Sequence, residues 1–242
     1  MTDHSDAAEI ATEAGQLLLE IRASGREQSE LKAEGDRRSN ELILARLASR
    51  RPGDAVLSEE SADDPARVGA DRVWIVDPLD GTREFSELGR DDWAVHVALW
   101  QDGHLVAGAV ALPAQGVTLA TPDVAVPPPA PAKPRIVVSR TRPPAVALDV
   151  RDALDGVLVE MGSAGAKVAS VVQGLSDAYV HAGGQYEWDS AAPVAVARAA
   201  GLHTSRLDGS PLEYNRPDPK LPDLVVCRPE LAEAVLKVTA GG

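Results

Sequence analysis

The sequence has little cysteine, few aromatic residues and a deficit of positive charge, and these shortages exclude several classes of protein. The single cysteine, Cys227, excludes an internal disulfide and a cysteine-based zinc cluster. Lysine and arginine number 24 against 37 aspartates and glutamates, so the net charge of −13 repels nucleic acid and anionic membranes. No apolar run approaches the roughly 20 residues of a membrane span, and the first residues show no secretory signal. We therefore expect a cytoplasmic protein that binds neither a nucleic-acid polymer nor a membrane.

The composition is that of a soluble globular protein, and the order of its predicted elements alternates between helix and strand. Of the 242 residues, 44% are hydrophobic and 25% are charged, which is enough to bury a sizeable core. Helical spacing marks residues 6–23, 39–49, 166–178, 189–201 and 230–238. Short apolar or alternating runs predict strands at 55–60, 73–76, 93–100, 104–113, 116–121, 135–140, 156–162, 179–183 and 221–229. We read residues 24–38 as a charged loop and Ser39 as the N-cap of the second helix.

A proline-rich segment, residues 121–135, divides this pattern in two. Proline has no backbone N–H and does not fit a helix interior or a central strand. We therefore expect an N-terminal part at 1–125 and a C-terminal part at 126–242, with the segment as hinge or connector. The alternation of helices and strands on both sides predicts a layered α/β fold.

The stretch Asp77-Pro78-Leu79-Asp80-Gly81-Thr82 carries the strongest chemical signal. Its two carboxylates follow an apolar strand, and ligands in α/β folds bind where strands end. Thr82 would serve as the N-cap of a short helix whose free N–H groups attract phosphate. An ordinary turn with a capping threonine is the alternative for the aspartates taken alone.

Other acidic residues fall at similar places. Glu59 and Glu60 end a predicted strand, Asp189 stands at the cap of a predicted helix with Pro193 in its first turn, and Asp36 precedes another. Taken singly, Glu59 and Glu60 could be solvated residues at a strand edge, and Asp189 and Asp36 could be ordinary helix caps. Together they form a set of hard oxygen ligands suited to Mg²⁺, with no competing histidine–cysteine set. His96, on an alternating strand, is interpreted as a residue of the core or sheet face.

The DPLDGT hexamer, the upstream Glu-Glu pair and the downstream run WDSAAPVAVARAAG resemble the inositol monophosphatase superfamily of Mg²⁺-dependent, lithium-sensitive phosphatases. The similarity extends over nearly the whole chain and implies an α-β-α-β-α layered sandwich. The segments TREF, GSAGAKVASVVQGLSDAYV, EWDSAAP and LDGSPLEYN resemble the CysQ-like members more closely.

The resemblance implies two principal metal sites. Glu59, Asp77 and the main-chain carbonyl of Leu79 would hold one Mg²⁺, and Asp77, Asp80 and Asp189 a second. A third, weaker ion would lean on Glu59 and Glu60. Asp36 and Thr82 would position the attacking water, so that Asp36, Thr82 and Glu59 are the expected catalytic residues.

The resemblance also implies a set of substrate contacts. Gly81 and Thr82 would offer backbone N–H groups to the phosphate. The remaining expected contacts are Ser139, Arg140, Ser163, Lys167 and Asp189. From the residues alone, Arg140 and its neighbour Arg142 could equally be solvated arginines, and Lys167 a surface residue of its helix.

The implied activity is Mg²⁺-dependent hydrolysis of the 3′-phosphate of 3′-phosphoadenosine 5′-phosphate to AMP, in sulfate assimilation. The sulfated analogue, PAPS, would be hydrolysed in the same way to APS. The first alternative is a phosphatase of broad specificity for inositol monophosphate or fructose 1,6-bisphosphate. His181, Ala182 and Gly183 stand where inositol-preferring relatives tend to carry an acid, although Glu187 is nearby. The second alternative is a non-catalytic module that binds metal or phosphate. A homodimer is also expected from relatives.

Overall fold

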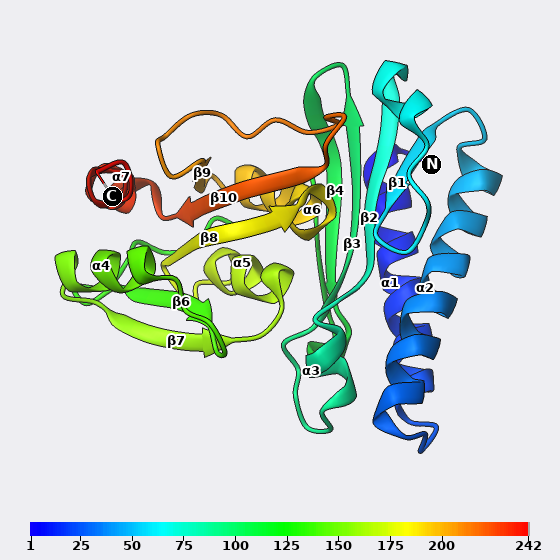
Figure 1. Ribbon diagram of the computed structural model, residues 1–242, viewed down its shortest axis with the longest axis horizontal. Helices are drawn as coiled ribbons and strands as arrows, with labels where there is room; N and C mark the ends of the chain where they lie inside the picture. The colour runs from blue at the N-terminus through cyan, green and yellow to red at the C-terminus, as the bar shows by residue number, and fades with distance from the viewer. Residues whose placement is uncertain (242) are drawn as a thin grey trace.

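The chain forms two five-stranded sheets (Figure 1). The strands of the first precede the proline-rich segment in the sequence, and those of the second follow it. The computed structural model describes residues 1–241, and no helix among them is long and apolar enough to cross a membrane. The first sheet has the order β1-β2-β3-β4-β5, with β1 and β2 parallel and the other pairs antiparallel. Its strands are β1 (Ala55–Ser58), β2 (Arg72–Asp80), β3 (Ala94–Gln101), β4 (His104–Leu112) and β5 (Val117–Ala120).

The second sheet has the order β7-β6-β8-β10-β9. Strand β6 pairs in parallel with β7 and β8, and β10 runs antiparallel to β8 and β9. The strands are β6 (Arg135–Ser139), β7 (Val157–Met161), β8 (Ala178–Tyr186), β9 (His203–Ser205) and β10 (Lys220–Cys227).

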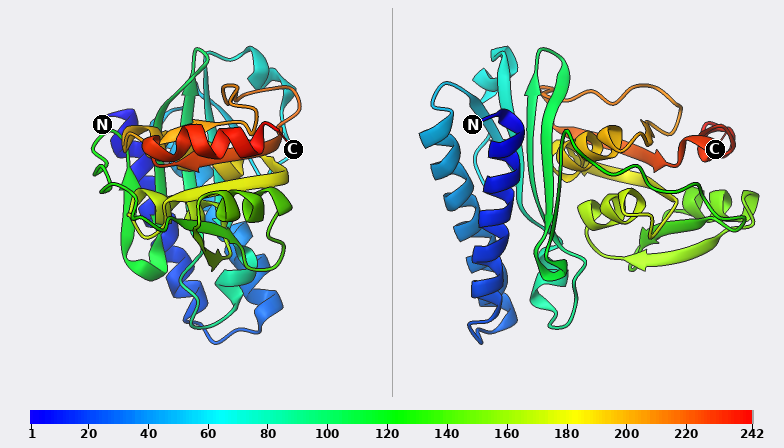
Figure 2. Two further views of the ribbon diagram at one scale, coloured as in Figure 1. Left: turned by 90° about the vertical axis from the view of Figure 1, so that its left-hand side faces the viewer. Right: turned by 180° about the vertical axis from the view of Figure 1, so that it is seen from behind.

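Seven α-helices lie within residues 1–241, and six of them form three layers that enclose the two sheets (Figure 1; the right-hand view of Figure 2 shows them from behind). Helices α1 and α2 cover the outer face of the first sheet, α5 and α6 lie between the sheets, and α4 and α7 cover the far face of the second sheet. The helices are α1 (Asp3–Arg22), α2 (Gln28–Arg50), α3 (Thr82–Ser86), α4 (Ala145–Ala153), α5 (Ala164–Val172), α6 (Glu187–Ala199) and α7 (Ala232–Thr239). The predicted α-β-α-β-α order is therefore confirmed.

Strand alternation explains why the first sheet is buried on both faces. Trp74 and Val76 of β2 pack with the α1–α2 layer, whereas Val73 and Ile75 pack into the core shared with α5, α6 and the second sheet. Successive side chains of a strand point to opposite faces, so a continuous apolar run such as 73–76 needs a layer on each side. The core crosses the proline-rich segment, and the division into 1–125 and 126–242 stays a prediction.

The predicted loop at 24–38 is wrong. Helix α2 begins at Gln28, so Asp36 lies within the helix and does not precede it. Leu31 and Gly35 are buried one turn apart on its inner face, and this packing outweighs the charged composition. Ser39 is not an N-cap: its buried hydroxyl donates to the carbonyl of Pro78.

Three other local predictions need correction. Strand β2 runs to Asp80, because a shift of register between Asp77 and Asp80 accommodates Pro78. The N-cap of α3 is Gly81, at φ +84°, and Thr82 is the first helical residue. Pro193 lies inside α6, beyond its first turn. The segment 121–134 forms neither helix nor strand, as its prolines predict.

Candidate active site

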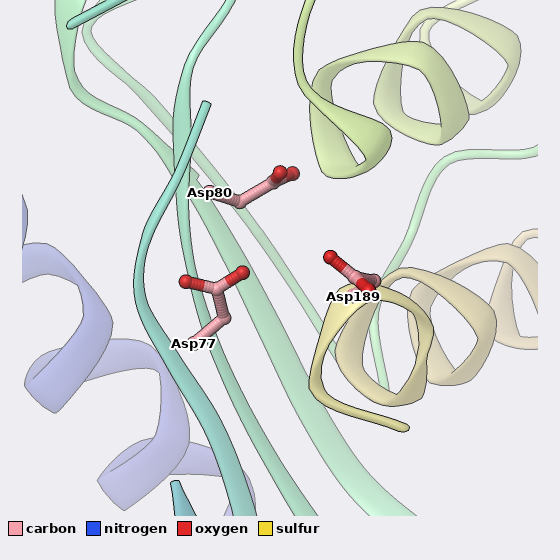
Figure 3. Close-up of side chains that lie close together, drawn as sticks. All are labelled: Asp77, Asp80 and Asp189. Atoms are coloured by element: carbon pink, nitrogen blue, oxygen red, sulfur yellow. The ribbon is translucent and has the colours of Figure 1, made fainter. Parts of the chain in front are cut away.

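Three carboxylates converge where β2 ends and α6 begins. Asp77, Asp80 and Asp189 each place one oxygen within 4.8 Å of the others. Figure 3 shows Asp77 and Asp80 pointing from β2 across the gap toward Asp189 at the start of α6. The cluster joins residues separated by more than a hundred positions, as the sequence predicted.

Asp77 is the most deeply buried member. One oxygen, Oδ1, accepts a hydrogen bond from the backbone N–H of Leu79 at 3.0 Å, and the other, Oδ2, has no hydrogen-bond partner among the described residues. Burial, and then the neighbouring carboxylates of Glu59, Asp80 and Asp189, raise its pKa well above the usual range. A buried carboxylate oxygen without a donor is costly, and a bound cation would remove that cost.

Asp80 holds the N-terminus of α5 against β2. Its Oδ2 accepts from the Ser163 hydroxyl and the Gly165 backbone N–H, both at 2.5 Å, and its Oδ1 accepts from the Ala164 N–H at 3.2 Å. The two backbone donors are free because the first turn of a helix has no internal acceptors for its N–H groups. Asp80 therefore ties the first sheet to the helix layer of the second part as well as facing the cluster.

Asp189 lies at the third position of α6, and the predicted cap position is occupied by Tyr186. Its Oδ2 accepts the backbone N–H of Tyr186 at 2.6 Å, which closes the first turn. Burial, and then the charge of Asp80, raise the pKa of Asp189 to about 7. The remaining oxygen can face the other two aspartates.

Glu59 and Glu60 follow β1 directly. The backbone N–H of Glu59 donates to the carbonyl of Val76 at 3.3 Å, which sets it beside β2. The residue is solvent-accessible, yet surrounding protein, and then Asp189, raise its pKa to about 7. Glu59 therefore interacts electrostatically with the cluster, although it lies outside the closest group of three.

Asp36 and Thr82 meet across the interface between α2 and α3. The Thr82 hydroxyl lies 3.3 Å from Asp36 Oδ1 and 3.2 Å from the carbonyl oxygen of Leu79, and its single proton can serve one of them at a time. Burial, and then Glu60, raise the pKa of Asp36 to about 6. The structure thus brings together the two residues expected to position water.

The turn before α5 packs closely on the loop after β2. A Cβ on Gly81 would lie 2.9 Å from the Cβ of Ser163, and Gly81 also needs its positive φ. Lys167 is buried, and its ammonium donates to the carbonyls of Gly162 and Ser163. Burial lowers its pKa, and it is not the surface residue that the sequence left open.

Ser139 and Arg140 are engaged elsewhere. The Arg140 guanidinium donates to Glu84 at 2.7 Å and to Glu87 at 2.9 Å. The Ser139 hydroxyl accepts the backbone N–H of Arg142 at 3.3 Å. Neither makes a hydrogen bond to the carboxylate cluster, so their substrate contacts stay predictions.

His96 is a site residue whose contacts the sequence reasoning missed. It is fully buried in β3, as expected, but its Nδ1 donates to the carbonyl of Trp188 at 3.0 Å and its Nε2 lies 3.3 Å from Asp80 Oδ2. Burial lowers its pKa. The pairing of β2 with β3 makes His96 the cross-strand partner of Asp77, and that register is visible only in the structure.

Glu187 was the acid that left the inositol alternative open. It is fully buried, and its two carboxylate oxygens accept the backbone N–H groups of Asn215 and Arg216 at 2.7 and 2.8 Å. Both oxygens are therefore occupied by the 215–216 loop. A sugar hydroxyl could bind to Glu187 only by displacing these backbone N–H groups.

The donor set fits a hard divalent cation. Carboxylate oxygens at this spacing are the ligands that Mg²⁺ and Ca²⁺ prefer, and the unpaired Oδ2 of Asp77 lies among them. Asp77, Asp80 and Asp189 could hold such an ion, with Glu59 and the Leu79 carbonyl beside them. A cation there would make an acidic site attractive to a phosphate dianion.

Comparison with known proteins gives a consistent result. The model of the inositol monophosphatase family matches residues 3–124 and 137–240. A 3′-phosphoadenosine 5′-phosphate phosphatase of Mycobacterium bovis is 55% identical over 239 residues, which cover 94% of this chain and 90% of that protein. The structure of CysQ from Bacteroides thetaiotaomicron has a TM-score of 0.79 at 28% identity, covering 93% of this chain and 97% of that one. Inositol monophosphatase II of Staphylococcus aureus has a TM-score of 0.82 at 20% identity, covering 98% and 96% of the two chains, which shows the shared fold.

Proposed function

Because this chain belongs to the inositol monophosphatase family, we propose that it removes the 3′-phosphate of 3′-phosphoadenosine 5′-phosphate and releases AMP. It is a phosphatase, and PAPS is its second expected substrate, yielding APS. The observation that carries the proposal is the cluster of the buried Asp77 and Asp80 with the partly buried Asp189, which includes an oxygen without a hydrogen-bond partner. Clearing this by-product of sulfate assimilation is the expected role, in the cytoplasm.

The proposed cofactor is Mg²⁺. Glu59, Asp77 and the carbonyl of Leu79 would hold one ion, and Asp77, Asp80 and Asp189 a second. When bound, such ions supply positive charge for the phosphoryl group and acidify a water molecule at neutral pH. The carboxylates by themselves would repel the substrate dianion.

The remaining residues have roles in orientation. Asp36 and Thr82, whose side chains lie 3.3 Å apart, are proposed to orient the attacking water and accept its proton. The backbone N–H groups of Gly81 and Thr82 are proposed to bind the phosphate. We propose that water attacks the phosphorus directly, in line with the leaving 3′-oxygen, and that no serine–histidine or cysteine–histidine pair acts as a nucleophile.

Substrate contacts in the second part are also proposed. Ser163 and Lys167 fix the turn that packs on Gly81, so they would shape the phosphate pocket. Arg140 could reach a 5′-phosphate by exchanging its bonds to Glu84 and Glu87 for a bidentate contact with phosphate. Ser139 would lie beside it. A homodimer remains an expectation that sedimentation would test.

The test is phosphate release from a panel of substrates. We expect turnover of 3′-phosphoadenosine 5′-phosphate and PAPS in Mg²⁺, inhibition by Li⁺, and at least tenfold lower kcat/KM for inositol 1-phosphate and fructose 1,6-bisphosphate. Equal or better turnover of inositol 1-phosphate would replace the proposal with the broad phosphatase. No phosphate release from any substrate in excess Mg²⁺ would favour a binding module.

A further inference from the structure

Tyr186 is the one exposed aromatic side chain within residues 1–241. The chain has only 4 tryptophans, 3 tyrosines and 1 phenylalanine. Tyr186 is 39% exposed, whereas two tryptophans are half-buried and the other five aromatic residues lie in the core. Those five are Trp74, Phe85, Trp93, Tyr179 and Tyr214. In a chain this poor in aromatic residues, an exposed ring requires an explanation.

The ring of Tyr186 is held in a fixed plane. It stacks on Trp188, with ring centroids 4.6 Å apart and planes only 3° from parallel. Trp188 in turn packs against the main core, and its carbonyl accepts a hydrogen bond from His96. Because Trp188 covers one face of the tyrosine ring, the exposed area lies on the opposite face and the edge.

The backbone that carries this ring is tied to the carboxylate cluster. The N–H of Tyr186 donates to Asp189 Oδ2 at 2.6 Å. The next residue, Glu187, is locked by its bonds to Asn215 and Arg216, and its own N–H donates to the carbonyl of Pro219 at 2.8 Å. The platform is therefore preorganised next to a proposed metal ligand. Tyr186 is the N-cap residue of α6, three positions before Asp189, so the start of one helix carries both the ring and a member of the cluster.

We propose that Tyr186, supported by Trp188, is a stacking platform for the purine base of the substrate. This inference rests on the proposed function and names a residue that selects nucleotides. A nucleobase offers a π-face on which an aromatic ring stacks favourably. Inositol and sugar phosphates lack a π-face and gain nothing from the platform, so Tyr186 contributes to specificity without touching the phosphoryl group.

The test compares two substrates on three variants. The substrates are 3′-phosphoadenosine 5′-phosphate and its abasic tetrahydrofuran 3,5-bisphosphate analogue. Tyr186→Ala should raise KM for the adenosine substrate about tenfold and lower the preference for it over the abasic analogue by the same factor. Tyr186→Phe, which keeps the ring, should retain the preference. Leu175→Ala, at a residue that is 59% exposed on another loop, is the matched control for loss of an exposed apolar side chain.

The outcomes separate this inference from the function on which it rests. If the unaltered protein prefers the adenosine substrate but Tyr186→Ala leaves that preference intact, the platform is refuted and the function stands. Equal losses of kcat/KM on both substrates would show that Tyr186 has only a structural role, and they would also refute the platform. If the unaltered protein does not hydrolyse the adenosine substrate, the proposed function itself fails.

Discussion

Replacing Asp77 with asparagine should change stability and activity in opposite directions. The substitution keeps the side-chain volume and the Oδ1 acceptor for the Leu79 N–H, while an uncharged NH₂ replaces the oxygen that has no partner. Two unit charges 4.8 Å apart, the outer limit within this cluster, repel by roughly 3.5 kcal/mol at an effective dielectric constant of 20. Protonation of Asp77 relieves part of this repulsion, and each unit between its pKa and the pH corresponds to about 1.4 kcal/mol. We therefore expect the free energy of unfolding of the metal-free variant to exceed that of the unaltered protein by roughly 2–4 kcal/mol at pH 8. Its rate of phosphate release in Mg²⁺ should fall at least about a thousandfold.

The pH dependence has a definite sign. The pKa values of Asp77, Asp189 and Glu59 are all raised in the folded protein, the latter two to about 7. A carboxyl group with a raised pKa destabilises the folded state as pH rises from its unfolded pKa toward its folded one. The advantage of Asp77→Asn should therefore be small near pH 4 and grow toward pH 8.

Urea denaturation in EDTA at pH 4.5, 6 and 8 measures this, with Asp123→Asn as the control at an exposed aspartate. Repeating the series in Mg²⁺ should stabilise the unaltered protein by about 2.7 kcal/mol at a hundred times the dissociation constant, and the variant much less. A variant that is less stable than the unaltered protein in EDTA at pH 8 would refute the reasoning. So would a gain that is the same at every pH.

Three further substitutions test other parts of the site and its support. Asp36→Asn should lower kcat by about 10²–10⁴-fold with little change in KM, since it removes the proposed proton acceptor; a loss confined to KM would contradict this. Gly165→Ala should destabilise the protein by at least about 1–3 kcal/mol, because its Cβ would lie 1.9 Å from His96 Nε2. Gly69→Ala, whose Cβ meets nothing within 4 Å, is the control, and equal midpoints in urea would refute the packing argument. Asp177→Asn should cost about 3–5 kcal/mol at pH 7, because it leaves the buried Arg228 guanidinium, 3.6 Å from Asp177, without its counter-charge; a loss of unfolding free energy under 1 kcal/mol would contradict it.

The residues by themselves predicted a layered α/β fold and marked the acidic metal-ligand candidates, whereas the five-layer order was implied by the family resemblance. Strand β2 is recognisable because an apolar run buried on both faces admits few polar residues, so Asp77 and Asp80 at its end stand out. The prolines of 121–134 exclude helix and strand through their fixed φ and missing N–H. These are local properties, and they need no knowledge of neighbours in space.

Only the tertiary structure decided how those residues are used. The charged composition of 24–38 favoured a loop, yet burial of Leu31 and Gly35 makes it a helix and places Asp36 opposite Thr82. The second task of Asp80, as an acceptor for the first turn of α5, depends on helix N–H groups more than eighty residues away. His96 and Tyr186 carry no signal in isolation, because their importance comes from strand register and from the packing of α6 on β3. Contacts between distant segments depend on which faces are buried together, and a single sequence specifies that only through the complete fold.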